Sequence, residues 1–500
     1  MTTEHFDVLI VGSGISGIGA ACHLRTDCPG KSFAILEGRE RIGGTWDLFK
    51  YPGIRSDSDM HTLGFAFKPW THEKSIADAP AILEYLRETT REFNVEKEIR
   101  FQHKVTSASF DSSTATWTVG IETGVKHVEM TCGFLFMCTG YYSYTDPYRP
   151  EFPGREQFTG PVVHPQFWPD NLDYQGKKVV VIGSGATAVT IVPALATSGV
   201  GQVTMLQRSP TYFLNRPAVD TFANIMRKIL PGKLAYAVTR WKNINMQAFF
   251  YKTAQTKPEK TAGKLIDLVS AELGADYDVK THFTPRYKPW DQRMCLVPDA
   301  DMFAAMRSGK ADVVTDEIEA FTATGITLKS GKSLDADIIV TATGLKMEIM
   351  SGVSLTIDGV SRKIGDTFSY KGCMYSDIPN LASSFGYSNA SWTLKADLIS
   401  EYVCRILKHI DETGKPIVVA RPDGISESDE GLMNLSSGYV QRSKGFVPKQ
   451  GNVDPWIVHH NYGLDKKLMR YGKLEDGALR FEKLHRQLSP QFDTMPIAAE

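Results

Sequence analysis

Two short apolar runs in this chain each lead directly into a glycine-rich turn. The first covers residues 8–11 and the second covers residues 178–182. Runs of this length, rich in β-branched residues, are typical of fully buried strands. After each turn, apolar residues recur at helical spacing, over residues 18–24 and 189–195. The pattern therefore predicts strand, turn and helix at two places, as in an α/β fold with two Rossmann-like domains.

The first turn, Gly12-Ser13-Gly14-Ile15-Ser16-Gly17, has the GxGxxG spacing of a dinucleotide site. Gly12 permits a tight turn, Gly14 lets the backbone approach a pyrophosphate, and Gly17 lets the helix pack on the strand. The start of the helix, which includes Ser16, faces the phosphates with its partial positive charge. A second strand over residues 32–36 ends at Glu37, where a carboxylate accepts hydrogen bonds from ribose hydroxyls.

The second turn has the related spacing GxGxxA. Its residues are Gly183, Ser184, Gly185, Ala186, Thr187 and Ala188. The next strand, residues 203–207, ends at Gln207 and lacks the acidic residue; Arg208 and Ser209 follow. A guanidinium pairs bidentately with a 2′-phosphate, whereas an acid repels it, so this site favours NADPH over NADH. A solvated surface arginine is the alternative interpretation of Arg208.

Two apolar strands that end in Thr-Gly, at residues 134–140 and 337–344, indicate where the chain crosses between domains. We expect a first domain over residues 1–145, a second over 146–345, and a return to the first over 346–500. Residues 216–288 have helical spacing and form a predicted helical insertion in the second domain. We expect the apolar residues of this insertion, around 241–250, to lie in a core or a domain interface.

Composition narrows the class of protein. The chain has 500 residues, 42% of them hydrophobic, and a net charge of -1, which argues against a nucleic-acid binder. It shows neither a signal peptide nor an apolar run of about 18 residues, so we expect no transmembrane segment. Seven cysteines without a CxxC pair suggest a reduced, cytoplasmic protein. We see no metal-ligand cluster, and the sequence leaves the oligomeric state open.

Upstream of the second turn, the segment Phe158-x-Gly160-x-x-x-His164-x-x-x-Trp168-Pro169 resembles the fingerprint of type I Baeyer–Villiger monooxygenases, which are class B flavoprotein monooxygenases. Residues 43–59, which read GGTWDLFKYPGIRSDSD, resemble another block of that family. Residues 289–298 and 389–397 are similar to the ethionamide-activating monooxygenase subgroup. One departure is that Gln292 and Met294 flank Arg293, where most cyclic-ketone enzymes have a Lys/Arg-Arg-Pro motif.

The resemblance implies FAD at the first turn and NADPH at the second. It places Gly44, Thr45 and Trp46 beside the flavin and the backbone of Val105 against the adenine. It makes His164 a linker residue that affects domain movement.

It also makes Arg293 the cation beside the flavin and Asp57 the carboxylate that holds it. Without the resemblance, a surface ion pair with Asp291 is the favoured interpretation of Arg293, and an exposed turn carboxylate is the alternative interpretation of Asp57.

The implied reaction uses a C4a-peroxyflavin. It inserts one oxygen atom of O2 into ketones, giving esters or lactones, and it oxidises sulfides or thioamides. The alternatives are a monooxygenase of nitrogen or sulfur without ketone activity, an NADPH oxidase, a flavin disulfide reductase and a non-catalytic redox-sensing module. The absence of closely spaced cysteine pairs argues against the reductase.

Overall fold

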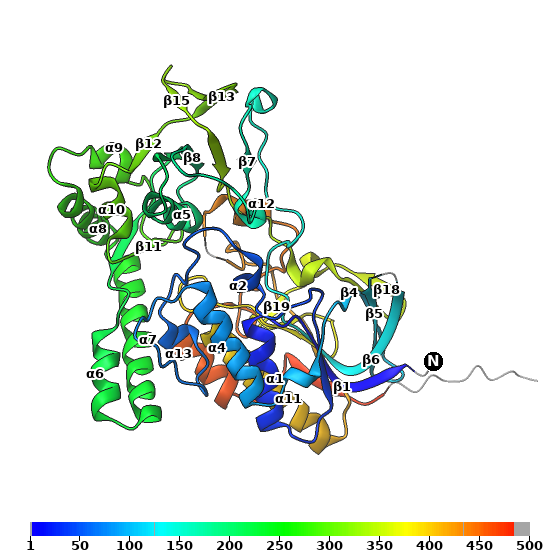
Figure 1. Ribbon diagram of the computed structural model, residues 1–500. Coiled ribbons are helices and arrows are strands. Elements are labelled where there is room, and N and C mark those ends of the chain that lie inside the picture. The colour runs from blue at the N-terminus through cyan, green and yellow to red at the C-terminus, as the bar shows by residue number, and fades with distance from the viewer. Residues whose placement is uncertain (1–2, 125, 434, 485–500) are drawn as a thin grey trace, which may run out of the picture.

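The computed structural model describes residues 3–124, 126–433 and 435–484. It shows two large sheets with helices packed around them, and several small sheets (Figure 1). The first glycine turn lies at the end of a strand in the larger sheet, and the second at the end of a strand in the smaller one. These are the two Rossmann-like units that the apolar runs predicted, so the α/β fold class is confirmed.

The larger sheet has the strand order β18-β17-β4-β5-β6-β1-β2-β3, and β21 also pairs with β6. Its strands are β1 (Glu4–Val11), β2 (Phe33–Leu36), β3 (Ile99–Arg100), β4 (Lys104–Asp111), β5 (Thr116–Thr123), β6 (Lys126–Met137), β17 (Ser354–Ile357), β18 (Val360–Arg362) and β21 (Leu381–Ser383). The strands β6, β1, β2 and β3 run parallel, which places the ends of β1 and β2 at the same edge of the sheet. Gly12 and Glu37 therefore lie close together at that edge.

The smaller sheet is parallel, with the order β12-β9-β8-β16-β7. Its strands are β7 (Val162–Val163), β8 (Lys178–Ile182), β9 (Gln202–Gln207), β12 (Ala311–Thr315) and β16 (Ile338–Thr341). The short strands of the remaining small sheets are β10 (Phe213–Arg216), β11 (Cys295–Pro298), β13 (Ile318–Thr322), β14 (Gly325–Leu328), β15 (Ser333–Asp335), β19 (Ser369–Tyr370), β20 (Met374–Tyr375), β22 (Ile417–Ala420) and β23 (Leu479–Glu482).

The helices that pack on the larger sheet and around it are α1 (Ile15–Asp27), α2 (Thr45–Leu48), α3 (Met60–Leu63), α4 (Ala79–Glu92), α11 (Trp392–Thr413), α12 (Gly438–Arg442) and α13 (Tyr462–Lys466). Those of the second nucleotide unit and its insertion are α5 (Ala186–Thr197), α6 (Thr221–Ile229), α7 (Gly232–Thr256), α8 (Pro258–Leu273), α9 (Val279–Phe283) and α10 (Asp301–Arg307). No helix in the described ranges is both long enough and apolar enough to span a bilayer.

The long helix α7 belongs to the insertion but packs against the first nucleotide unit. Arg240 donates hydrogen bonds to the carbonyl oxygens of His61 and Gly64, and Asn243 donates to Asp59 at 2.9 Å. Arg240 and Asn243 are buried, so these bonds fix the insertion against α3. The buried contacts of this face are thus made by polar side chains of α7.

The opposite face of α7 corrects an expectation from the sequence. Trp241 is 69% exposed and Phe249 is 72% exposed, whereas both were expected in a core or an interface. At 3.6 residues per turn, the buried Arg240 and Asn243 point away from the stripe that carries Leu234 and Trp241. The apolar residues of α7 occupy both faces, and among the described residues the stripe with Leu234 and Trp241 stays exposed.

Candidate active site

The first glycine turn is held by Glu37. Its carboxylate accepts hydrogen bonds from the Ser13 amide at 2.8 Å and the Ser13 hydroxyl at 2.7 Å, and from the Arg39 amide at 3.0 Å. A carboxylate has about four lone-pair positions, so one remains for a ribose hydroxyl. The sequence predicted Glu37 as a ligand contact but missed its bonds to Ser13, which order the turn itself.

The turn leaves no room for larger residues. At Gly17 a Cβ would lie 1.9 Å from the carbonyl oxygen of Gly12, which itself has φ +102°. Gly14 is the N-cap residue of α1 and Gly44 that of α2, and a Cβ on Gly44 would lie 3.1 Å from the Gly14 Cα. The two glycine segments therefore face each other across a narrow gap.

A cavity of about 260 Å³ extends from this gap. Gly14, Ser16, Gly44, Thr45 and Trp46 all line it. Thr45 is fixed by a 2.5 Å hydrogen bond between its hydroxyl and that of Tyr142. Backbone amides at a helix start, small residues and one carboxylate are the groups that hold the pyrophosphate and ribose of a dinucleotide, so the residues fit FAD.

Val105 is not among the residues that line the cavity. It is buried in β4 and pairs with Ile121 of β5. The start of its strand nevertheless lies beside the first site, because the His103 amide donates to the Glu37 carbonyl oxygen at 2.8 Å. An adenine contact by the Val105 backbone stays a prediction.

The second glycine turn opens toward the same cavity. At Gly183, with φ +134°, a Cβ would lie 2.3 Å from the Ala342 carbonyl oxygen, whereas Gly185 has open space around it. Ala186 and Thr187 line the cavity, whereas Ala188 lies on the buried face of α5. The open approach at Gly185 suits the pyrophosphate of a second dinucleotide.

At the end of β9 the three predicted residues differ in their surroundings. The Gln207 side chain is buried, and its amide donates hydrogen bonds to the His282 carbonyl oxygen and to the Thr315 hydroxyl. Both amide hydrogens are therefore used within the protein. Arg208 and Ser209 are exposed, and the Ser209 carbonyl accepts a hydrogen bond from Ser184 at 3.0 Å. Arg208 is therefore accessible to a phosphate beside the second turn.

Arg293 and Asp57 meet at the point where two cavities join. Arg293 Nη2 lies 3.0 Å from Asp57 Oδ2, and both residues line the 260 Å³ cavity and a second one of about 250 Å³. Asp57 raises the pKa of Arg293 above its ordinary value, so the guanidinium stays charged. The surface pair with Asp291 that the sequence left open is not what the structure shows.

The second cavity has a mainly apolar wall. The residues that line it with Arg293 and Asp57 include Leu214, Met246, Phe250, Trp290, Met294 and Leu296, and its polar rim includes Gln247, Ser388 and Asn389. Met246, Gln247 and Phe250 come from α7, so the insertion forms part of the cavity wall. Arg216 also lines this cavity, so the wall carries two cations, of which Arg293 is paired with Asp57. A concave, largely apolar site with fixed cations suits a small apolar molecule with a single polar atom.

Sequence reasoning missed two aromatic residues beside Arg293. Tyr141 lies within hydrogen-bonding reach of Arg293 and stacks on Trp392, with ring centroids 5.3 Å apart. Trp392 in turn donates from its indole nitrogen to Ser16 Oγ at 2.8 Å. The local signals were the Thr139-Gly140 strand end before Tyr141 and the family-like segment 389–397 that contains Trp392. Neither signal places the two rings together, because these contacts form between distant parts of the chain.

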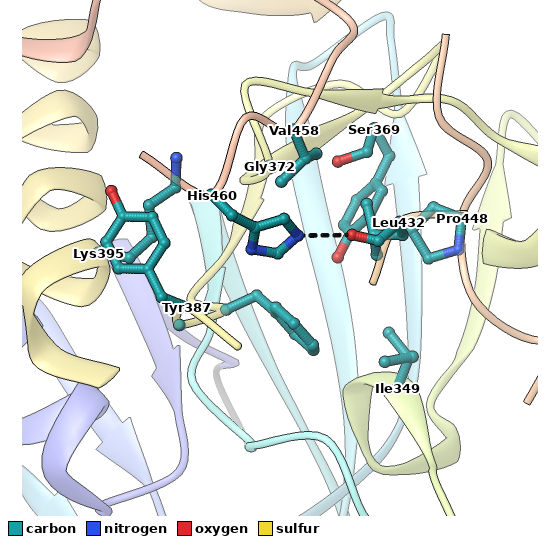
Figure 2. A pocket seen from close by; sticks show the side chains of 12 residues that line it. Ile349, Ser369, Gly372, Tyr387, Lys395, Leu432, Pro448, Val458 and His460 are labelled. Atoms are coloured by element: carbon teal, nitrogen blue, oxygen red, sulfur yellow. Dashed lines mark hydrogen bonds between the residues drawn. The ribbon is translucent and has the colours of Figure 1, made fainter. Parts of the chain in front are cut away.

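A third, much smaller cavity is lined by Tyr387, Leu432 and His460, among others (Figure 2). It holds about 20 Å³, which is room for one water molecule and not for a substrate. In Figure 2 the His460 ring points at the Leu432 carbonyl oxygen, 2.9 Å from Nε2. The His460 carbonyl accepts a hydrogen bond from Asn389, so this cluster supports the loop that lines the apolar cavity.

The side chain of His164, the predicted linker histidine, contacts the backbone two residues further along the chain. Its Nδ1 accepts a hydrogen bond from the Gln166 amide at 3.2 Å. Burial and the nearby Arg149 lower the pKa of His164 to about 4. The ring is therefore neutral at ordinary pH, and its role in domain movement stays a prediction.

Comparison with known proteins identifies the family of this chain. Residues 67–256 match a model described as flavin-binding monooxygenase-like, and residues 10–77 match a model of an NAD(P)-binding Rossmann-like domain. The chain belongs to the flavin-binding monooxygenase family, because similar proteins match nearly its whole length. The family expected from the sequence is thus confirmed.

One such relative is the FAD-containing monooxygenase EthA of Mycobacterium tuberculosis, which is 53% identical over 96% of this chain and 98% of its own length. Another is the probable FAD-binding monooxygenase AlmA of Acinetobacter baylyi, 48% identical over 96% and 97%. Among solved structures, an oxidized steroid monooxygenase bound to NADP has a TM-score of 0.77 at 21% identity and covers 96% of this chain and 100% of its own. An open structure of cyclohexanone monooxygenase has a TM-score of 0.72 at 20% identity and covers 84% and 91%. The structures share the fold.

Proposed function

We propose that this chain is an FAD- and NADPH-dependent monooxygenase that inserts oxygen into ketones and oxidises sulfides or thioamides. The observation that carries the proposal is the position of Arg293. It is a permanently charged group, held by Asp57, at the junction of a cavity lined by both glycine turns and an apolar cavity. FAD-containing relatives at 53% and 48% identity support the cofactor assignment.

FAD would be held by the first glycine turn, Glu37 and the segment from Gly44 to Trp46, and NADPH by the second turn and Arg208. When bound and reduced, the flavin supplies the activated oxygen that the protein alone does not provide.

The chain's own residues position and polarise the substrate. In the proposed complex, the guanidinium of Arg293 donates a hydrogen bond to the carbonyl oxygen of a ketone that lies in the apolar cavity. This bond strengthens as negative charge develops on that oxygen, which lowers the barrier to attack at the carbonyl carbon. Asp57 keeps Arg293 in place and charged.

The apolar wall selects the substrate class. Phe250 and Trp290 offer no charged group to a substrate, and Leu296 lines both cavities. A ketone or sulfide with aliphatic or aromatic substituents buries apolar surface here, at about 25 cal/mol per Å². A cationic substrate would lose its hydration and would lie beside the like charges of Arg293 and Arg216.

The direct test is product analysis of the FAD-loaded protein with NADPH, O2 and either 2-octanone or thioanisole. An ester from the ketone and a sulfoxide from the sulfide are expected, each matched by NADPH consumed. Sulfoxide without ester would identify a heteroatom monooxygenase instead. Hydrogen peroxide equal to the NADPH consumed, with neither product, would identify an NADPH oxidase and contradict the proposal.

A further inference from the structure

The hairpin of α6 and α7 concentrates the exposed apolar side chains of this protein. Of the fourteen large hydrophobic residues that are exposed in the described part of the chain, six lie in α6 and α7, between residues 221 and 256. In Figure 1 the two helices stand side by side at the left edge of the molecule. Such a concentration on one projecting element marks an interaction site.

The turn between the two helices carries the centre of this surface. Ile229, the last residue of α6, is 63% exposed, and Leu234 in the first turn of α7 is 50% exposed. Ile225 lies four residues before Ile229 on the same face of α6, and Trp241 lies seven residues after Leu234 on the same face of α7. Neither described cavity includes any of these four residues, so the surface is separate from the candidate active site.

The charged side chains of this segment are all positive. Residues 221–258 contain seven Lys or Arg residues and no Asp or Glu, in a chain whose net charge is -1. Some of these cations are engaged in contacts within the chain. Arg240 is buried, and Lys242 forms an ion pair with Asp220 at 3.1 Å. Lys228 and Lys233 are exposed, and each is adjacent in sequence to an exposed apolar residue of the turn.

We propose that the tip of the α6–α7 hairpin docks on an anionic lipid membrane, with Ile229 and Leu234 inserted among the headgroups and Lys228 and Lys233 bound to lipid phosphates. Apolar side chains flanked by lysines, on a helix surface without acidic residues, are the features that hold a protein in the interfacial plane. Trp241, with an apolar ring and a polar N–H, suits the same interface higher on α7. In this arrangement a surface helix contacts the membrane, and no helix among the described residues is suited to span it.

A second copy of the chain fits this surface less well. A symmetric dimer brings the same patch of both copies together. Lys228 and Lys233 of one protomer would then lie opposite the same two lysines of its partner. Like charges at such an interface are costly, whereas anionic lipid phosphates neutralise them. The one-sided charge therefore favours the lipid surface.

The test is flotation of the FAD-loaded protein with vesicles of phosphatidylcholine containing roughly one-third phosphatidylglycerol, compared with pure phosphatidylcholine, at about 0.1 M salt. Binding to the anionic vesicles only is expected. The variant Lys228→Glu/Lys233→Glu should weaken binding at least about tenfold, because each cation near an anionic surface contributes about fivefold. Ile229→Ser/Leu234→Ser should weaken it comparably, because it removes the inserted apolar surface.

The matched control is Val360→Ser/Arg362→Glu, which changes an exposed apolar residue and a cation on the distant β17–β18 hairpin. It should bind vesicles as the natural chain does. All variants should keep their FAD content and their melting temperature, which separates a loss of docking from a loss of fold. The proposal is wrong if the natural chain does not float with anionic vesicles, or if the tip variants float equally well. A switch to a smaller oligomer in the tip variants, seen by sedimentation velocity and without any vesicle binding by the natural chain, would show that a second copy covers the surface instead.

Discussion

Trp392 and Ser16 lie 376 residues apart in the chain, yet the Trp392 indole donates to Ser16 Oγ at 2.8 Å. Ser16 is in the first turn of α1, directly after the glycine-rich loop, and Trp392 is the first residue of α11. The bond ties the returning C-terminal part of the chain to the proposed FAD site. Through the stack on Tyr141, the same tryptophan also supports the side of the cavity at which Arg293 lies.

Trp392→Phe should therefore weaken FAD binding. The phenyl ring keeps an aromatic contact with Tyr141 but loses the N–H donor, and one hydrogen bond contributes about 0.5–1.5 kcal/mol, or about two- to twelvefold in affinity. The measurement is the dissociation constant of FAD from the apoprotein, followed by flavin fluorescence. Trp241→Phe, on the exposed face of α7, is the control. Equal affinity in the Trp392 variant would show that this bond does not support the flavin site.

Glu37→Gln should lower both FAD affinity and the stability of the apoprotein. The carboxylate accepts from Ser13 on one oxygen and from Arg39 on the other, whereas an amide offers an NH2 group to one of these donors. Two donors then face each other, at a cost of about 1–3 kcal/mol. Urea unfolding of the apoprotein measures this cost without the cofactor. The exposed Glu40→Gln is the matched control, and an unchanged unfolding midpoint in Glu37→Gln would contradict the role assigned to the carboxylate.

Arg208→Gln should change the preference between the two nicotinamide cofactors. If its guanidinium pairs with the 2′-phosphate, the KM for NADPH rises at least about tenfold, while the KM for NADH stays unchanged. Lys329→Gln is a suitable control, because Lys329 is an exposed cation that pairs with Glu317. An equal rise in the KM for NADPH and the KM for NADH would mean that Arg208 does not bind the 2′-phosphate.

Stability should fall as the pH drops from about 6.5 to about 4, in part because of His164. Its pKa in the folded protein is lowered to about 4, so the unfolded chain binds a proton in this window that the folded chain does not. The contribution is fully present above the unfolded pKa and is lost as the pH falls through the folded pKa. After allowance for partial exposure it amounts to about 1–2 kcal/mol.

The check is to compare urea unfolding at pH 7.5 and at pH 5 for the natural chain and for His164→Gln. The variant should lose less stability on acidification, whereas His5→Gln, an exposed histidine, should behave like the natural chain. Identical pH dependence in His164→Gln would mean that His164 is not protonated on unfolding.

The two glycine turns were predictable because their geometry is local. At Gly17 and Gly183 the backbone leaves no space for a Cβ, and the spacing of small residues records that requirement. Glu37 was predictable for a similar reason, since parallel strands end at one edge. Arg293 and Asp57 came from the family resemblance alone, because nothing in their local sequence separates a functional pair that lines a cavity from an ordinary surface pair.

Contacts between distant segments were beyond reach of the sequence. Tyr141 and Trp392 meet only after the chain has returned to its first domain. The exposure of Trp241 was mispredicted because α7 has apolar residues on two faces, and the pattern does not say which face finds a partner. The fold thus followed from local periodicity, and the walls of the site depended on tertiary packing.

The central claim is that Arg293 polarises the substrate at the junction of the two cavities. The most direct measurement is the amount of ester formed from 2-octanone per NADPH consumed, in Arg293→Ala and Arg293→Lys compared with the natural chain. FAD content should be unchanged in both variants. Ester formation should fall at least about a hundredfold in Arg293→Ala and less in Arg293→Lys, which keeps a cation without the guanidinium's paired donors. Normal ester yield in Arg293→Ala, with FAD bound, would contradict the role of Arg293 and with it the proposed mechanism.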